Sequence, residues 1–323
     1  MQKKRVFLTR TLHDFALKEL KKKYIVEIHS GKIPIPKKKL ASKIKDIEGL
    51  ICFPYDIIDK ELIDNAKNLK VISTYSVGFD HIDIEYSKEK KIRVGYTPEV
   101  LTDSTADLAF SLMLDVMRRV SEGDRIIRNG KWEEIYGAYD YVGIDLQGKT
   151  LGIFGLGRIG SALAKRAKSF DMKIIYHNRK KISKTKEKKL GAKYVSFEKL
   201  LTQSDVISIH VPHSKQTDQL FDKNVFRKMK KSSFLINTAR GKIVNEDHLI
   251  RALKEKTITG AGLDVFESEP IGKNHPLTKI ENVTLAPHIG SSTKETRAKM
   301  AEITVKNLHL GILGRKPKFS VGF

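Results

Sequence analysis

Short apolar runs alternate with longer amphipathic stretches along this chain, a pattern typical of strands separated by helices. In the first hundred residues the runs that predict strands are 5–9, 24–28, 50–53, 71–74 and 92–94. Further along they are 149–154, 173–176, 205–211, 233–238, 260–265 and 283–286. Strands that alternate with helices in this way predict an α/β fold with two doubly wound, mostly parallel sheets.

The helical stretches divide these strands between two domains. One long helix is predicted over residues 103–128, because apolar side chains recur there at helical spacing. Residues 293–310 predict a final helix that can return to the first domain. We therefore expect a discontinuous first domain, residues 1–100 and 289–323, and a second domain of residues 101–288.

An aromatic segment lies between the two sheets. Residues 130–148 place Trp132, Tyr136, Tyr139 and Tyr141 among glycines and acids, which indicates a loop or arm. These aromatics would pack either on a partner subunit or within the loop itself.

A glycine pattern marks the first turn of the second sheet. Gly155, Gly157 and Gly160 form G-x-G-x-x-G between the apolar run 149–154 and a helical stretch at 161–167. The first glycine permits a tight turn, the second lets the backbone approach a pyrophosphate, and the third lets helix and strand pack closely. The N–H groups at the positive end of that helix would face the phosphates. The pattern therefore predicts a Rossmann dinucleotide-binding domain.

Composition limits the function further. The 323 residues are 40% hydrophobic and carry a net charge of +23, with lysines clustered at 21–23, 37–39 and 184–189. We interpret this charge as solvated surface that also attracts anionic substrates, because no RNA-binding motif or zinc-ligand spacing accompanies it. Nucleic acid and metal are therefore not expected. No run suits a signal peptide or membrane span, and the single cysteine, Cys52, fits a reducing cytoplasm.

The residues after the second strand of this domain bear on the choice of cofactor. A carboxylate there bonds the ribose 2′-hydroxyl, whereas an arginine accommodates a 2′-phosphate. Here the strand is followed by Asn178, Arg179 and Lys180, without an acid. Arg179 can grip a phosphate in a planar fork, and Lys180 adds a second positive charge. We predict a preference for NADPH over NADH; the alternative is that both cations are ordinary surface residues.

Three side chains with acid–base or anion-binding chemistry stand just beyond the last three apolar runs. Arg240, Glu269 and His288 each follow the end of one of these runs. Ligands of open α/β sheets bind outside the carboxyl ends of the strands, so these three side chains can converge on one ligand.

Four segments of the second domain, 155–160, 237–241, 262–270 and 287–291, closely resemble the D-isomer-specific 2-hydroxyacid dehydrogenase family. In the first domain, SVGFDH from Ser76 and VGYTPEVLTD from Val94 are similar to the glyoxylate/hydroxypyruvate reductases of that family. The likeness extends over essentially the whole chain. It implies a Rossmann domain joined to a flavodoxin-like substrate domain.

The resemblance implies that Arg240, Glu269 and His288 are the catalytic residues. The guanidinium of Arg240 can bind the carboxylate and the ketone of a 2-oxo acid in a fixed orientation. His288 can donate a proton to the ketone oxygen as general acid, and accept it in the reverse direction. Glu269 would stabilise the imidazolium and orient its ring. The nearest competing histidines, His210 and His213, lie in what resembles a loop flanking the cofactor.

The resemblance also implies substrate and cofactor contacts elsewhere. The backbone N–H groups of Val77 and Gly78 would hold the substrate carboxylate, the alternative being a plain turn. Asp264 would lie near the nicotinamide amide. The further cofactor contacts would be Thr105, Gly155, Leu156, Gly157, Arg158, Ile159, Gly160, Asn178, Arg179, Lys180, Val211, Pro212, Thr217, Thr238, Ala239, Arg240, His288 and Gly290.

We therefore expect a cytoplasmic, homodimeric reductase that closes a two-domain cleft over NADPH and a small 2-oxo acid. Glyoxylate or hydroxypyruvate would be reduced to glycolate or D-glycerate, with NADH as the alternative cofactor. Two other functions stay open. One is a D-2-hydroxyacid dehydrogenase for phosphoglycerate or D-lactate, and the other is a non-enzymatic protein that senses a dinucleotide.

Overall fold

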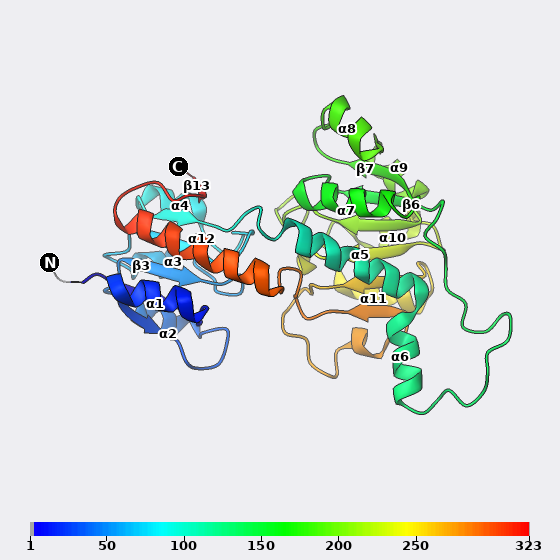
Figure 1. Cartoon of the computed structure of the whole chain (residues 1–323), viewed down its shortest axis with the longest axis horizontal. Coiled ribbons are helices and arrows are strands. Elements are labelled where there is room, and N and C mark those ends of the chain that lie inside the picture. Colours follow the sequence, from blue (N-terminus) through cyan, green and yellow to red (C-terminus); the bar gives the residue numbers. More distant parts are fainter. Residues whose placement is uncertain (1–2, 323) are drawn as a thin grey trace. The chain divides into compact units, whose positions relative to one another are not determined.

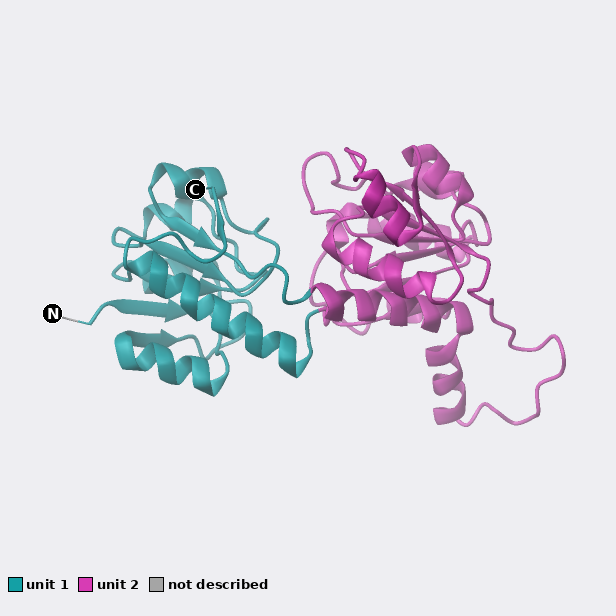
Figure 2. Cartoon of the chain, turned by 45° about the horizontal axis from the view of Figure 1, so that its top comes forward, with its two compact units in different colours: residues 1–101, 291–323 teal, residues 102–290 magenta. Residues whose placement is uncertain are grey.

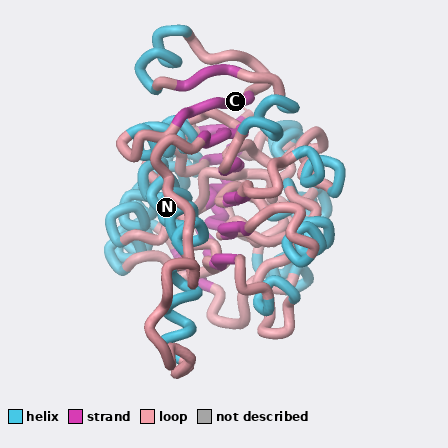
Figure 3. Tube along the Cα trace, turned by 90° about the vertical axis from the view of Figure 1, so that its right-hand side faces the viewer, coloured by secondary structure: helices cyan, strands magenta, loops and turns pink. Residues whose placement is uncertain are grey.

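Two mostly parallel sheets organise the chain, one in each of two compact units. The computed structural model describes residues 3–322. Unit 1 combines residues 1–101 with 291–323, and unit 2 is residues 102–290 (Figure 2). The strands of the two sheets lie between helices on either side (Figures 1 and 3). The predicted fold class, two doubly wound α/β domains, is confirmed.

The sheet of unit 1 has the strand order β13-β5-β4-β3-β1-β2. Its strands are β1 (Arg5–Leu8), β2 (Ile25–Ile28), β3 (Gly49–Cys52), β4 (Val71–Thr74), β5 (Arg93–Gly95) and β13 (Ser320–Val321). Neighbours are parallel except for β13, which pairs antiparallel with β5. The parallel order β2-β1-β3-β4-β5 is that of flavodoxin-like folds. The central strands β3 and β4 are buried along their whole length, because helices cover both faces of such a sheet.

The last helix of the chain completes the core of unit 1. The helices of this unit are α1 (Asp14–Lys23), α2 (Lys37–Lys43), α3 (Lys60–Asp64), α4 (Ile84–Glu89) and α12 (Lys294–Ile312). Helix α12 packs against β3, β4 and β5 through side chains that include Leu308 and Ile312, both buried. The final helix predicted over 293–310 is therefore present, and it returns to the first unit.

The sheet of unit 2 has the strand order β8-β7-β6-β9-β10-β11-β12, with every neighbouring pair parallel. Its strands are β6 (Thr150–Phe154), β7 (Lys173–His177), β8 (Ala192–Tyr194), β9 (Val206–Ile209), β10 (Phe234–Asn237), β11 (Gly260–Leu263) and β12 (Val283–Leu285). This is the Rossmann order with a seventh strand added at the β12 edge. The carboxyl ends of β9 to β12 consequently meet at one edge of the sheet, where the candidate residues lie.

Seven α-helices surround this sheet within the described chain. They are α5 (Thr102–Arg118), α6 (Val120–Arg128), α7 (Arg158–Lys168), α8 (Lys184–Leu190), α9 (Phe197–Gln203), α10 (Lys223–Lys228) and α11 (Glu246–Lys254). Short 3₁₀ turns follow β10 and β11, at Gly241–Ile243 and Pro276–Lys279. Helix α5 packs against β10, β11 and α7. Among residues 3–322, no helix has both the length and the apolar character that crossing a membrane requires.

The prediction of one helix over residues 103–128 is wrong, because the chain breaks at Arg119. This residue has φ 57°, in the left-handed region, and separates α5 from α6. The Asp115 carboxylate accepts hydrogen bonds from the N–H and the hydroxyl of Ser121, both at 2.7 Å, which stabilises the new helix start. From the following loop, the Tyr141 hydroxyl donates to the Arg119 carbonyl at 2.8 Å. Tyr141 of the predicted aromatic arm therefore packs within unit 2. Figure 2 shows the loop that extends from α6.

Two short strands were not predicted. β8 has three residues, of which only Ala192 is buried, and β13 has two half-buried residues. Segments of this length contain no periodic signal, so their extended conformation depends on pairing with β7 and β5.

Candidate active site

The glycine turn joins β6 to α7 in a conformation that explains each glycine. Gly155 has φ 102°, and a Cβ there would approach the His210 carbonyl to 2.7 Å. A Cβ at Gly160 would lie 2.5 Å from the Gly155 oxygen, whereas one at Gly157 would meet nothing within 4 Å. The turn is therefore packed on the inside and open at Gly157. Because Gly157 caps α7 without a side chain, the N–H groups of Ile159 and Gly160 have no side-chain acceptor, as a bound phosphate requires.

Asn178 ties the glycine turn to the end of the neighbouring strand. Its Oδ1 accepts a hydrogen bond from the Leu156 N–H at 2.6 Å, and the His177 carbonyl accepts one from the Gly155 N–H at 3.0 Å. Arg179, the next residue, is exposed, as is Lys180. The predicted ribose-reading segment therefore lies beside the glycine turn, with two cations at its exposed end.

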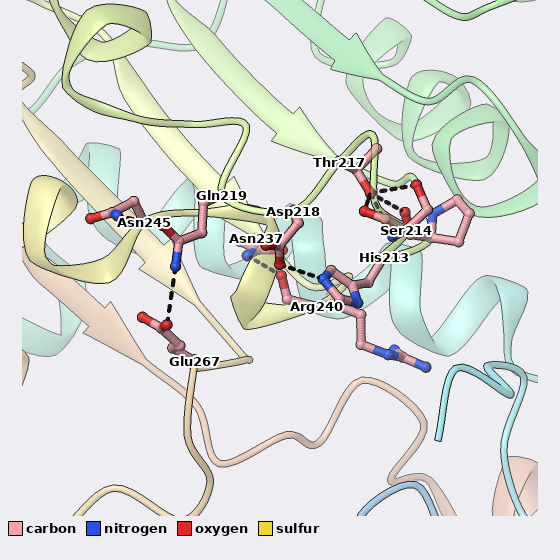
Figure 4. Close-up of polar contacts among 10 residues, drawn as sticks. His213, Ser214, Thr217, Asp218, Gln219, Asn237, Arg240, Asn245 and Glu267 are labelled. Atoms are coloured by element: carbon pink, nitrogen blue, oxygen red, sulfur yellow. Dashed lines mark hydrogen bonds and ion pairs between the residues drawn. The ribbon is translucent and has the colours of Figure 1, made fainter. Parts of the chain in front are cut away.

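The loop after β9 packs on the same turn. Val211 is one of the residues that a Cβ at Gly155 would strike. The Thr217 hydroxyl closes the loop by donating to the Pro212 carbonyl at 2.9 Å and accepting from the Ser214 N–H at 2.8 Å (Figure 4). Thr217 and Pro212, predicted as cofactor contacts, therefore belong to a loop that packs on the glycine turn through Val211.

Two buried threonines, Thr105 and Thr238, differ in the hydrogen bonding of their hydroxyls. Thr105 donates to the Gly290 carbonyl at 3.2 Å. Thr238, which follows β10 and is 8% exposed, has a hydroxyl with no hydrogen-bond partner in the described chain. Buried hydroxyls are almost always paired, so Thr238 has capacity for a ligand group. The unpaired hydroxyl of Thr238 and the open turn at Gly157 both fit a dinucleotide.

His288 and Glu269 form a close acid–base pair. The Nδ1 atom of His288 lies 2.7 Å from Oε2 of Glu269, and both side chains are about one-third exposed. Glu269 is oriented in turn by the Phe266 N–H, which donates to its Oε1 at 3.0 Å. Burial alone would raise the pKa of the Glu269 carboxyl, but the hydrogen bond and charge of His288 lower it below its usual value. Since a carboxylate can only accept, Nδ1 carries a proton and Nε2 is the ring atom that can exchange one with a ligand.

Asp264 holds the backbone on which His288 sits. Its carboxylate accepts hydrogen bonds from the N–H groups of Ile289 at 2.7 Å and Gly290 at 2.8 Å, and its carbonyl accepts one from His288 at 2.9 Å. His288 has φ 54°, a strained conformation that these bonds stabilise. Asp264 is only 1% exposed, and this burial raises its pKa to about 6. The sequence indicated a cofactor contact here but gave no sign of this backbone clamp.

Arg240 is presented by the loop after β10. Asn237, at the end of that strand, donates from Nδ2 to the Arg240 carbonyl at 3.0 Å and accepts from the Ala239 N–H at 3.0 Å. The Arg240 guanidinium donates to the Ala239 carbonyl at 2.7 Å and extends away from Asn237 (Figure 4). Its charge contributes to the lowered pKa of Glu269, which places the two side chains in one electrostatic neighbourhood.

Direct backbone packing joins the Arg240 loop to the Glu269 loop. A Cβ at Gly241 would overlap the carbonyl group of Phe266. A polar bridge supports the contact: Asn245 donates to Gln219 at 2.8 Å, and Gln219 donates to Glu267 at 3.4 Å (Figure 4). Sequence reasoning missed these supporting residues. Asn237 alone left a signal, a polar side chain closing a buried apolar run.

The two competing histidines, His210 and His213, have hydrogen-bond partners outside the candidate catalytic group. His210 contacts the Ser208 hydroxyl at 2.8 Å through Nε2, and loss of water around its ring lowers its pKa to about 4. His213 pairs with Asp218 at 2.7 Å on the loop after β9. A ring that is neutral at physiological pH, as His210 is, makes a poor proton donor. Of the candidate groups in unit 2, the structure therefore brings together Arg240, Glu269 and His288.

Val77 and Gly78 lie in unit 1, just beyond the carboxyl end of β4. Both are partly buried, and neither backbone N–H makes a hydrogen bond within residues 3–322. Adjacent N–H groups left free in this way suit a small anion such as a carboxylate.

Comparison with known proteins adds an independent finding. Residues 110–290 match the family described as D-isomer specific 2-hydroxyacid dehydrogenase, NAD binding domain. The chain is 46% identical over 318 residues to a glyoxylate reductase of Thermofilum pendens, covering 98% of this chain and 94% of that protein.

Solved structures are similar over the full length. The TT0316 protein of Thermus thermophilus has a TM-score of 0.91 and 43% identity, covering 98% of this chain and 99% of that chain. An NADPH-dependent glyoxylate/hydroxypyruvate reductase of Sinorhizobium meliloti, solved with NADP and malonate, has a TM-score of 0.86 and 28% identity, covering 99% and 97%. The similarity therefore spans both units.

Proposed function

Because this chain belongs to the D-isomer specific 2-hydroxyacid dehydrogenase family, we propose that it reduces glyoxylate and hydroxypyruvate to glycolate and D-glycerate. The observation that carries this proposal is the pair formed by His288 and Glu269 beside Arg240, at the strand ends of a Rossmann sheet. Relatives named glyoxylate reductase, similar along nearly the whole chain, support the choice of substrate.

The proposed reaction divides the chemistry between three side chains. A bound nicotinamide would supply the hydride that reduces the 2-oxo carbonyl, an aldehyde in glyoxylate and a ketone in hydroxypyruvate. The Arg240 guanidinium holds the substrate through its carboxylate and its 2-oxo oxygen. As negative charge develops on that oxygen, His288 donates a proton to it from Nε2. Glu269 stays ionised, stabilises the positive charge of the imidazolium until the proton is donated, and fixes the orientation of the ring through Nδ1.

A panel of 2-oxo acids tests the substrate. We expect turnover of glyoxylate and hydroxypyruvate to exceed that of pyruvate and phosphohydroxypyruvate, measured as NADPH and NADH oxidation. A preference for phosphohydroxypyruvate or pyruvate would favour a phosphoglycerate or D-lactate enzyme. Salt-dependent DNA binding without any reduction would favour a dinucleotide-sensing protein, in keeping with the charge of +23.

The cofactor is a nicotinamide dinucleotide, and we propose that NADPH is preferred. The exposed Arg179 and Lys180 beside the glycine turn support this proposal, as does the absence of a carboxylate at Asn178. Replacing Arg179 with alanine should raise the KM for NADPH about 10- to 100-fold, the value of a charge-assisted contact, and leave the KM for NADH nearly unchanged. Steady-state kinetics with each cofactor measure both values.

Lys181→Ala is the matched control for Arg179→Ala. It removes the same charge two residues away, from a side chain that lies over the Tyr194 ring. This variant should keep the wild-type ratio of the two cofactor efficiencies. Equal efficiency with NADPH and NADH in the wild type, unchanged in Arg179→Ala, would reject the proposed preference.

We further propose a homodimer that works in the cytoplasm. The exposed Ile135 and Tyr139, each more than 90% accessible in the loop after α6, are suited to a second subunit, and one buried cysteine suits a reducing compartment. Light scattering on the purified protein should give twice the mass of 36.6 kDa. A mass of one chain at micromolar concentration would exclude the dimer.

A further inference from the structure

A chain of buried hydroxyls runs beneath the Val77–Gly78 turn of unit 1. The Ser76 hydroxyl donates to the Gly78 carbonyl at 2.5 Å. Thr74 Oγ1 lies 2.8 Å from Ser76 Oγ and 3.0 Å from Nε2 of His81. Thr74 is fully buried and Ser76 is 5% exposed, so water does not compete for these bonds.

The chemistry of these groups fixes the direction of every proton in the chain. The Gly78 carbonyl can only accept, so the single Ser76 proton is directed to it. Thr74 must then donate to Ser76 Oγ, which leaves Thr74 Oγ1 to accept from His81. His81 therefore carries a proton on Nε2, and the Cys52 Sγ, 3.9 Å from the same nitrogen, is a second and weaker acceptor for it. Donation runs one way, from His81 through Thr74 and Ser76 to the Gly78 carbonyl.

A second bond anchors the other end of the turn. The Thr97 N–H donates to the Ser76 carbonyl at 2.8 Å. In a trans peptide the N–H points opposite to the carbonyl, so this bond aims the Val77 N–H away from Thr97. The Val77–Gly78 segment is thus held between two anchored carbonyls, and its own two N–H groups stay unpaired within residues 3–322.

We propose that Thr74, Ser76 and His81 are positioning residues for the substrate carboxylate. Their one-way chain holds the Gly78 carbonyl, and with it the two N–H donors, in the orientation that receives the anion. Preorganised donors bind more tightly because they lose less conformational freedom on binding. This inference rests on the proposed function, since it assigns Val77 and Gly78 to the carboxylate of a 2-oxo acid.

Two substitutions at Thr74 test the hydroxyl chain against simple packing. Thr74→Val keeps the shape but removes the hydroxyl, so the KM for glyoxylate should rise about 5- to 10-fold, the value of one buried hydrogen bond. Because the loss acts on binding, kcat and the KM for NADPH should stay within about twofold. Thr74→Ser keeps the hydroxyl and loses a methyl group, and should retain the wild-type KM. A packing effect would instead impair Thr74→Ser at least as much.

Binding of oxalate provides a readout that does not depend on turnover. Calorimetry in the presence of NADP should show weaker oxalate binding to Thr74→Val than to the wild type or Thr74→Ser. If the wild type reduces no 2-oxo acid, the proposed function fails, and these oxalate affinities alone decide the inference. Unchanged KM and oxalate affinity in Thr74→Val would overturn it. If Thr74→Val does not fold, Ser76→Ala takes its place with the same expected shifts.

Discussion

Replacing His288 with alanine is expected to lower kcat about 10²- to 10⁴-fold, the usual contribution of a general acid. Nε2 of His288 is the ring atom left for the substrate once Nδ1 is bound to Glu269 at 2.7 Å. Alanine would leave the 2-oxo oxygen of the substrate without its proposed proton donor but would not alter the glycine turn that would hold the cofactor. The dissociation constant of NADPH, measured by fluorescence titration, should therefore stay within about threefold of wild type.

His29→Ala serves as a control for this variant. His29 lies on the surface of unit 1, where its ring contacts the Lys32 carbonyl at 2.9 Å, and the substitution should leave kcat unchanged. A His288→Ala enzyme that retained a tenth or more of wild-type kcat would remove His288 from the mechanism. A parallel loss of NADPH affinity would instead assign it a binding role.

Arg240→Ala should reduce kcat/KM for glyoxylate about 100-fold, through both a higher KM and a lower kcat. The guanidinium is expected to contact the substrate before and during reduction, and charge-assisted hydrogen bonds are among the strongest in proteins. Arg240→Lys keeps the charge but not the planar fork, so its kcat/KM should lie between those of Arg240→Ala and the wild type. Steady-state kinetics over a wide glyoxylate range separate the two parameters.

The matched control is Arg251→Ala on α11. Arg251 is largely exposed and pairs with Glu255 one turn away, so its loss should change neither parameter. Wild-type kinetics in Arg240→Ala would reject the proposed substrate contact. If Arg240→Lys were as impaired as Arg240→Ala at saturating substrate, the planar fork would matter more than the charge.

The sheets were predictable because their strands are buried on both faces. β3, β9, β10 and β11 are short runs of fully buried residues, and such runs stand out in any polar background. The break at Arg119 was not predictable from periodicity, since apolar spacing continues across it. It depends on Asp115 reaching Ser121 and on Tyr141 reaching back from a loop 22 residues away.

The three candidate residues could be proposed from the sequence, but the residues that support them could not. Arg240, Glu269 and His288 each stand just past a strand end, where ligands of parallel sheets bind, and the family resemblance supplied their proposed roles. The partners of Asn178 and Asp264 could not be found, because both side chains bind backbone N–H groups of distant residues. Asp264 and Gly290, for example, are 26 positions apart in the chain. Backbone N–H groups look alike in every sequence, so only the fold shows which of them are left to bind.

The contact between Gly241 and Phe266 has a consequence for redesign of this protein. Because the backbone at Gly241 lies directly against the backbone at Phe266, the loop that carries Arg240 cannot shift without moving the loop that carries Glu269. If Arg240 and His288 act as proposed, substitutions around residue 240 that change which 2-oxo acids bind should therefore also change the rate of proton donation. Variants that change substrate selectivity without changing kcat should therefore be sought outside these two loops.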